Sequence, residues 1–237
     1  MKRTVLSLSF LCLAYVCAPA QSSSVPAQPA AHHASASPHA PSAEKVWADL
    51  MEGNQRFAAG TPKARPLVQL RTQLAGGQQP KVVVLACSDS RVAPELLFDQ
   101  SLGDLFVVRS AGNIADAIGV GSVEYAVEHL GSTVLVVLGH TKCGAVTAAC
   151  SKEKMPTPNL QAIVDKIDPA VTRASKSGSA GDALLEAAIR ENVHQSADDV
   201  MAASEALRHF RDDGKLTVIE AEYDLATGKV TRLDAAK

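Results

Sequence analysis

The sequence predicts an α/β protein in which helices flank a central, mainly parallel β-sheet. Two observations predict this fold class. Several short runs of valine and leucine are continuously apolar, as strands buried on both faces of a parallel sheet are. Segments with apolar residues at helical spacing lie between these runs, and such an alternation is typical of one domain built around a parallel sheet.

The predicted elements begin near residue 43. Val46, Leu50, Met51 and Phe57 recur at helical spacing, and the helix that they predict ends at 60–62, which reads Gly-Thr-Pro. The predicted strands are 82–86, 105–108, 134–138, 216–223 and 229–233, with a turn at 226–228. The other predicted helices are 120–130, which Gly131 closes, 145–150, 161–167 and 183–210.

The first 20 residues have the pattern of a cleaved signal peptide. Lys2 and Arg3 precede an apolar stretch, 5–17, that is too short to span a bilayer comfortably, and 18–20 (Ala-Pro-Ala) is a small-residue cleavage signal. We therefore expect export, to the periplasm, rather than an uncleaved anchor. Residues 21–42 are rich in Ser, Ala and Pro and predict a disordered linker, which leaves 43–237 as a single folded domain.

The charge balance argues against two kinds of partner. Lys and Arg number 23 and Asp and Glu 25, which gives a net charge of −2, and aromatic residues make up 4% of the chain. Nucleic-acid binding relies on basic surfaces and stacking aromatics, so we expect no nucleic-acid partner. Once the signal peptide is removed, we also expect no stable membrane insertion.

Three cysteines remain after the predicted cleavage: Cys87, Cys143 and Cys150. An odd number in an exported protein is not explained by a simple disulfide framework. Cys143 and Cys150 would lie about 10 Å apart along one helix, beyond disulfide reach, so Cys150 is most simply a small buried hydrophobe. A disulfide between Cys87 and Cys143 stays open as an alternative.

Residues that suit a metal follow two of the predicted strands. In ACSDSRV (86–92), the alternation of side chains along an extended segment would place Cys87, Asp89 and Arg91 on one side. LGHTKCGAV (138–146) places His140 and Cys143 before a helix whose amino end favours a thiolate at Cys143. Sites in such sheets lie beyond the carboxyl ends of strands, and two thiolates, an imidazole and a carboxylate suit tetrahedral zinc. We therefore expect Cys87, Asp89, His140 and Cys143 to converge on Zn²⁺.

These two motifs, C-x-D-x-R and H-x-x-C, resemble those of the β-class carbonic anhydrases. The resemblance extends from about Val46 to Leu233 and includes EGNQRF (52–57), GDLFVVRSAGN (103–113), SVEYAVEHLG (122–131) and YDLATGKV (223–230). It implies one zinc ion per subunit, held by Cys87, His140 and Cys143. Asp89 would be the fourth ligand or would be displaced by water.

The resemblance also implies an activity and a gate. The reaction would be the reversible hydration of carbon dioxide to bicarbonate and a proton by zinc-bound hydroxide, because zinc lowers the pKa of its water to about 7. Pairing with Arg91 would move the Asp89 carboxylate off zinc and open a position for that water. Asp89 and Arg91 are thus the expected catalytic residues, and a purely structural ion pair is the alternative.

Four further residues match the family's substrate pocket by alignment: Gln78, Phe106, Ala111 and Tyr125. An apolar wall suits carbon dioxide, which carries no net charge or dipole. In dimers of the family this pocket lies at a subunit interface, so the resemblance implies a homodimer or a tetramer of dimers.

The sequence departs from the family pattern at two places. Val84 stands where some bacterial members with an inhibitory bicarbonate site have tryptophan, so we expect no such bicarbonate switch, although Arg109 matches an arginine of that site. SAGN (110–113) replaces a common NVAN, which we expect to alter pocket details without touching the metal ligands.

Two other functions are compatible with the same motifs. A hydrolase of carbon disulfide or carbonyl sulfide with this fold would keep the zinc residues. A non-catalytic protein would use zinc merely to stabilise its fold, but Asp89 and Arg91 argue against this reading because a structural site needs no gate.

Overall fold

The computed structural model describes residues 41–234, and the whole predicted sheet falls within them. The predicted signal peptide and nearly all of the predicted linker lie outside the described residues, so both stay predictions. Among residues 41–234, no helix combines the length and the apolar character that a membrane span requires.

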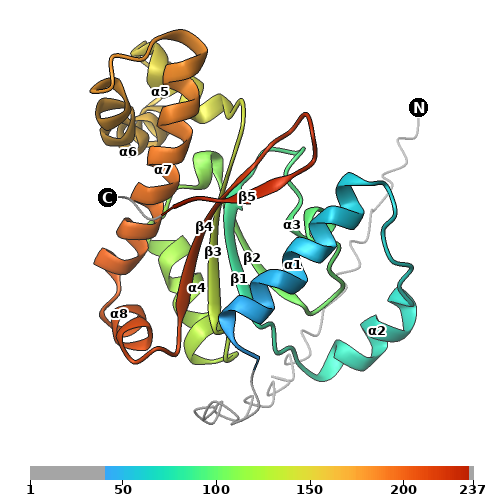
Figure 1. The fold of residues 1–237 in the computed structure, drawn as a ribbon. Helices are drawn as coiled ribbons and strands as arrows, with labels where there is room; N and C mark the ends of the chain where they lie inside the picture. The colour runs from blue at the N-terminus through green and yellow to red at the C-terminus, as the bar shows by residue number, and fades with distance from the viewer. Residues whose placement is uncertain (1–40, 235–237) are drawn as a thin grey trace, which may run out of the picture. The chain divides into compact units, whose positions relative to one another are not determined.

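A five-stranded sheet organises the described residues (Figure 1). Its strands are β1 (Val82–Cys87), β2 (Leu105–Ser110), β3 (Val134–His140), β4 (Thr217–Tyr223) and β5 (Val230–Arg232). Their order is β2-β1-β3-β4-β5; β2, β1, β3 and β4 are parallel, and β5 runs antiparallel to β4. Each strand coincides with a predicted one, and the predicted mainly parallel sheet is confirmed.

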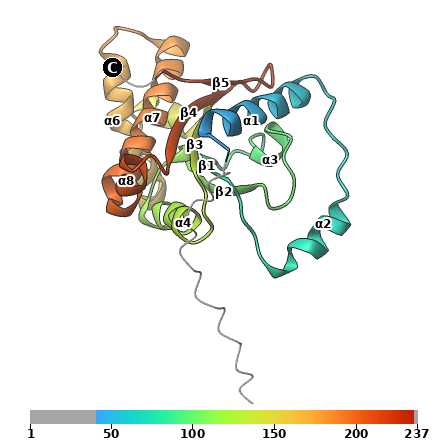
Figure 2. The same ribbon diagram turned by 60° about the horizontal axis from the view of Figure 1, so that its bottom comes forward.

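Helices cover both faces of the sheet, and further helices lie beyond the carboxyl ends of its strands (Figures 1 and 2). They are α1 (Ala43–Ala58), α2 (Leu67–Gln73), α3 (Pro94–Leu97), α4 (Ala117–Glu128), α5 (Gly144–Ser151), α6 (Pro158–Ser175), α7 (Gly181–Ala203) and α8 (Glu205–Asp212), with short 3₁₀ turns η1 (Leu74–Gly76) and η2 (Ala111–Asn113). One face packs against α1 and α3, and the other against α4, α7 and α8. Helices α5 and α6 lie beyond the carboxyl ends of the strands, at the top of Figure 1.

The central strands fill two cores because their side chains alternate between the faces of the sheet. Val82 and Val84 pack on the α1 side with Trp47. Val83 and Leu85 pack on the opposite side with α4 and α7. Every residue of β1 and β3 is buried, as their continuous apolar runs predicted.

The expectation that all the apolar runs are buried on both faces is wrong for β2. This strand forms one edge of the sheet, and each of its residues is partly or fully exposed. Phe106 contacts Tyr125 of α4, with ring centroids 6.2 Å apart, and Tyr125 is itself 46% exposed. An apolar run does not reveal strand order, which depends on connections that the sequence does not state.

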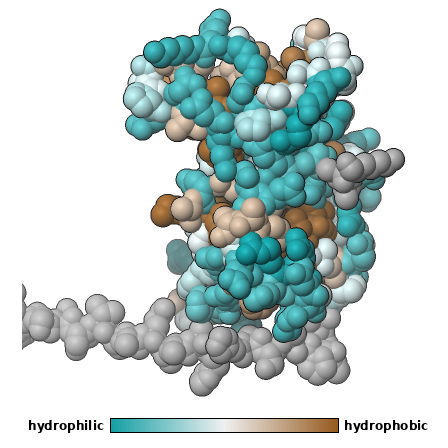
Figure 3. Space-filling model, turned by 90° about the vertical axis from the view of Figure 1, so that its left-hand side faces the viewer, coloured by the Kyte–Doolittle hydropathy of each residue, from teal (hydrophilic) through white to brown (hydrophobic). Residues whose placement is uncertain are grey.

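Large exposed apolar side chains are few and scattered over the described residues: Leu67, Val68, Leu96, Leu102, Ile118, Tyr125 and Leu160. Ile118 and Tyr125 lie about two turns apart on one face of α4, close to β2. On the face drawn in Figure 3, apolar areas lie at mid-height between largely hydrophilic regions. Apolar surface beside an edge strand is a common feature of subunit contacts.

The single helix predicted at 183–210 is two helices, α7 and α8. The helix is interrupted at Ser204, which is buried and has an extended backbone (φ −123°, ψ 115°). Its hydroxyl accepts a hydrogen bond from the N–H of Leu207, as a serine at a helix N-cap does. The apolar spacing continues through the break, so periodicity does not reveal it.

The EGNQRF segment joins α1 to two other parts of the fold. Gly53 lies against the backbone after α3, since a Cβ there would be 1.8 Å from the Phe98 carbonyl oxygen. Asn54 is 2% exposed; its Nδ2 donates hydrogen bonds to the carbonyls of Leu97 (3.0 Å) and Gly228 (2.9 Å). Its Oδ1 accepts one from the N–H of Val230 (2.9 Å). This amide therefore ties α1 to α3 and to the β4–β5 hairpin.

Helix α2 belongs to an arm, defined here as residues 61–81, that stands away from the sheet (Figures 1 and 2), and no residue of α2 is buried. The base of the arm is held by Asp99, whose buried carboxylate pairs with Arg56 (2.5 Å) and Arg65 (2.7 Å). Burial alone would raise the pKa of Asp99, but hydrogen bonds from the two guanidinium groups lower it to about 2. Further along the arm, Leu74 lies against Gly103, just before β2. The arm therefore leads to the amino end of the sheet.

Candidate metal centre

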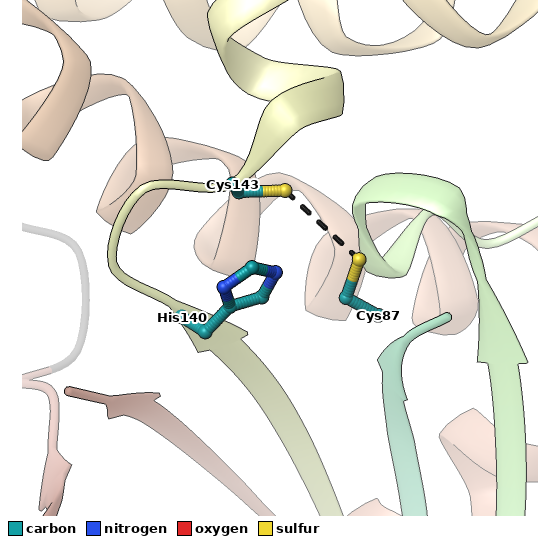
Figure 4. A group of neighbouring side chains, drawn as sticks. All are labelled: Cys87, His140 and Cys143. Atoms are coloured by element: carbon teal, nitrogen blue, oxygen red, sulfur yellow. Dashed lines mark hydrogen bonds between the residues drawn. The ribbon is translucent and has the colours of Figure 1, made fainter. Parts of the chain in front are cut away.

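Two cysteines and a histidine meet at the carboxyl ends of β1 and β3 (Figure 4). Cys87 ends β1, His140 ends β3, and Cys143 immediately precedes α5. One ligand atom from each residue lies within 4.8 Å of the other two. The sulfur atoms of Cys87 and Cys143 are 4.0 Å apart, so the disulfide alternative is not adopted. Because β1 and β3 are neighbouring parallel strands, their ends bring these three residues together as the sequence predicts.

The donor atoms of this cluster fit zinc. His140 is fully buried, and its Nδ1 lies 2.9 Å from the carbonyl oxygen of Thr141, which places the ring proton on Nδ1 and leaves a lone pair on Nε2. Nε2 is buried without a hydrogen-bond partner among the described residues, an arrangement that costs free energy unless a ligand takes the lone pair. Two cysteine sulfurs and this nitrogen are the ligands that tetrahedral zinc sites use.

The two thiols differ in their tendency to ionise. The pKa of Cys87 is lowered, chiefly by the contact of its sulfur with Cys143, and the N–H groups of Asp89 and Gly112 act in the same direction. The hydrogen bond to Cys87 and the burial of Cys143 raise the pKa of Cys143. The N–H groups at the start of α5 act in the opposite direction, as expected, but they do not outweigh these effects.

Asp89 and Arg91 lie in a turn after β1, so the predicted alternation along a strand is not what brings them together. The N–H of Val92 donates to the carbonyl of Asp89 (2.9 Å) and closes this turn. The Arg91 guanidinium then grips the carboxylate with two hydrogen bonds, Nε to Oδ1 (2.9 Å) and Nη2 to Oδ2 (2.7 Å). These hydrogen bonds hold the pKa of Asp89 well below its usual range.

The Asp89 carboxylate lies beside the cluster rather than in it. Its Oδ2 is 4.0 Å from His140 Nε2, and the compact group of potential ligands comprises the other three residues. Arg109 of β2 fixes the backbone of the turn: its Nε donates to the carbonyl of Cys87 (3.0 Å) and its Nη2 to that of Asp89 (2.6 Å). The turn is thereby held with Asp89 paired to Arg91.

The SAGN segment does contact a predicted metal ligand, Cys87, which we did not expect. The N–H of Gly112 donates a hydrogen bond to Cys87 Sγ, at 3.3 Å. Gly112 has φ +71°, and a Cβ at this position would lie 2.7 Å from Ile167 Cδ1 and 3.1 Å from Ala145 Cβ. Both the backbone conformation and the close packing therefore require glycine.

Three of the four predicted substrate-binding residues lie far from the metal cluster of their own chain. Phe106 pairs with Val83, four residues before Cys87, which places it about 13 Å back along the sheet. Tyr125 contacts Phe106, and Gln78 is an exposed residue of the arm, on the approach to the amino end of β1. Ala111, which precedes Gly112 in η2, is the member of the set that adjoins the cluster.

Comparisons with known proteins match this arrangement to one family. A family model described as Carbonic anhydrase matches residues 82–230. Carbonic anhydrase 2 of Mycobacterium tuberculosis is 38% identical over 193 residues, which cover 80% of this chain and 92% of that protein.

Solved structures of similar fold point the same way. The β-carbonic anhydrase CcaA is 28% identical with a TM-score of 0.66, and the match covers 80% of this chain and 95% of that one. A tetrameric β-carbonic anhydrase of the fungus Sordaria macrospora is 23% identical with a TM-score of 0.66, over 81% of this chain and 99% of that one. The second likeness concerns the fold alone.

Proposed function

This chain belongs to the β-class carbonic anhydrases, and we propose that it hydrates carbon dioxide reversibly to bicarbonate and a proton at zinc held by Cys87, His140 and Cys143. The observation that carries this proposal is the buried cluster of three donor atoms within 4.8 Å of one another. The unpartnered Nε2 of His140 supports it, because its lone pair is available for a metal. Zinc, when bound, supplies a water acidic enough to lose its proton near neutral pH.

In the proposed mechanism, Asp89 orients the reacting water and Arg91 keeps Asp89 available for that task. Asp89 is ionised at neutral pH, so its carboxylate accepts a hydrogen bond from a water beside His140 Nε2, 4.0 Å away. The two-pronged contact with Arg91 holds the carboxylate away from the ligand cluster. Release of that contact would let Asp89 turn toward the cluster as a further ligand, which is how the pair would act as a gate.

We propose that the substrate pocket is completed in a homodimer. In this arrangement Gln78, Phe106 and Tyr125 of one chain face the metal centre of its partner, because they lie too far from their own. The partly exposed apolar surface of β2 and α4 supports a subunit contact there. Phe106 and Tyr125 would supply an apolar wall for carbon dioxide, and the amide of Gln78 would hydrogen-bond to bicarbonate.

We also propose that the enzyme works outside the cytoplasm. Residues 1–20 carry the basic start, apolar stretch and small-residue cleavage signal of a signal peptide. Sequencing of the protein from a periplasmic fraction should give Gln21 as the first residue. Recovery of the chain with its first 20 residues intact, in the cytoplasmic fraction, would contradict export.

Stopped-flow hydration of carbon dioxide tests the proposed activity directly. The zinc-loaded protein should be fast and should gain activity from about pH 6 to about pH 9 as its zinc-bound water ionises. Asp89→Asn keeps the shape of the side chain but removes its charge, and it should reduce the rate about 10- to 100-fold. Asp213→Asn, which disrupts the exposed ion pair with Lys215, is the matched control and should leave the rate unchanged. A zinc-replete protein no faster than buffer would overturn the proposal and direct attention to other small linear substrates.

A further inference from the structure

The η2 turn beside the metal cluster is held from the opposite side by helix α7. The side chain of Asn192, 1% exposed, donates a hydrogen bond from Nδ2 to the carbonyl of Gly112 (2.8 Å). One turn later along α7, the buried hydroxyl of Ser196 lies 3.5 Å from Asn113 Nδ2. Two consecutive residues of the turn are therefore bound to two consecutive turns of one helix.

Gly112 connects this contact to the metal ligand. Its carbonyl accepts from Asn192, and its own N–H donates to Cys87 Sγ. Ile167 and Ala145 close off the space where a Cβ would be, so the turn has little freedom to shift. The hydrogen bond from Asn192 therefore helps to hold in place the residue whose N–H points at Cys87 Sγ.

The placement of Asn192 is costly for a residue that serves stability alone. Its Oδ1 is buried and has no hydrogen-bond partner among the described residues. Replacing Asn192 by an apolar residue removes this unpaired acceptor but also leaves the Gly112 carbonyl without its donor, so the two effects on stability oppose each other. The contact that Asn192 does make is the hydrogen bond to Gly112, which points to a role in the site rather than in the core.

We propose that Asn192 is a positioning residue for the metal centre, which acts through Gly112 to aim a hydrogen bond at Cys87 Sγ. Partners outside the ligand set commonly fix the orientation and basicity of metal ligands, and their loss costs about 10- to 100-fold in metal affinity or activity. The proposal rests on zinc binding at Cys87, His140 and Cys143. It does not require that carbon dioxide be the substrate.

Zinc release from the loaded protein into excess chelator tests this proposal without an activity assay. Asn192→Leu and Asn192→Ser both remove the hydrogen bond to Gly112, and each should release zinc about 10- to 100-fold faster than the wild type. Asn54→Ser is the matched control, because Asn54 is an equally buried amide bonded to backbone carbonyls, but neither residue that accepts its hydrogen bonds donates to a cysteine of the cluster. It should weaken the fold without accelerating zinc release.

Two further readouts separate positioning from a structural role. Cobalt-loaded Asn192→Ser should show a shifted sulfur-to-metal absorption band, whereas Asn54→Ser should keep the wild-type spectrum. Asn192→Leu should lower the thermal stability of the metal-free chain less than Asn54→Ser does, because it breaks one buried hydrogen bond rather than three, while it releases zinc faster. Release within twofold of wild type together with an unchanged cobalt spectrum would overturn the proposal. Failure of both Asn192 variants to fold, while Asn54→Ser folds, would also overturn it by making Asn192 a folding residue.

Discussion

Mixing an inactive variant with a weakened one tests whether each metal centre uses Gln78 of the neighbouring chain. Cys87→Ser removes a zinc ligand but keeps Gln78, and Gln78→Ala keeps the zinc ligands but removes one neutral hydrogen bond, which should lower the rate about tenfold. In a 1:1 mixture, about half of the dimers contain one chain of each kind. Each of these mixed dimers has one complete site, in which the Gln78→Ala chain supplies the zinc ligands and the Cys87→Ser chain supplies Gln78. The mixture should therefore reach about one quarter of the wild-type rate, against roughly one twentieth if Gln78 serves its own chain.

The structure sets this expectation through the register of the sheet. Phe106 lies about 13 Å from Cys87 along the strands, and Gln78 lies beyond the amino end of the same sheet. The assay is stopped-flow hydration after the two variants are unfolded together, refolded with zinc and separated by differently charged tags. Purified mixed dimers that are no faster than the average of the two parent proteins would refute the shared pocket. Mixing without subunit exchange supplies the baseline.

Three other predictions concern the framework of the site. Asn54→Ser should lower the free energy of unfolding by about 2 to 4 kcal/mol in urea titrations, because three buried hydrogen bonds are lost; a change below about 0.5 kcal/mol would contradict that role. Asp99→Asn should cost about 2 kcal/mol at neutral pH, because the folded protein lowers the pKa of Asp99 to about 2. The wild-type advantage should disappear as the pH falls from about 4 to about 2, and an advantage that persists there would count against the Asp99 pairing. Gly112→Ala should both destabilise the fold and accelerate zinc release, since its Cβ would meet Ile167; normal behaviour in both assays would show that the turn adapts.

The main parts of the fold follow from local physical rules. Strands such as β1 and β3 carry continuous apolar runs because helices cover both of their faces, and the sequence displays this directly. The sequence predicts that Cys87 and His140 lie close together, because both end strands of one parallel sheet. The cluster required only that these two strands be neighbours.

What the sequence did not reveal depends on contacts between distant segments. Asn54 donates a hydrogen bond to Gly228, 174 residues away, and the local sequence around either residue does not predict this contact. The break at Ser204 is hidden because apolar spacing continues on both sides of it. Asn192 lies within an ordinary helical pattern, and its link to Gly112 appears once α7 is placed against η2. Edge and inner strands likewise look alike until the strand order is known.

If the pocket is completed in a homodimer, as proposed, zinc binding and turnover depend on different assemblies. All three predicted ligands come from one chain, so a subunit diluted away from its partner should keep its zinc while it lacks the partner's Gln78, Phe106 and Tyr125. Inactivation by dilution would then be reversible and would need no resupply of metal. A newly synthesised chain would likewise be loaded with zinc first and become active when it meets a second copy, which would make chain concentration, rather than zinc, the quantity that switches activity on.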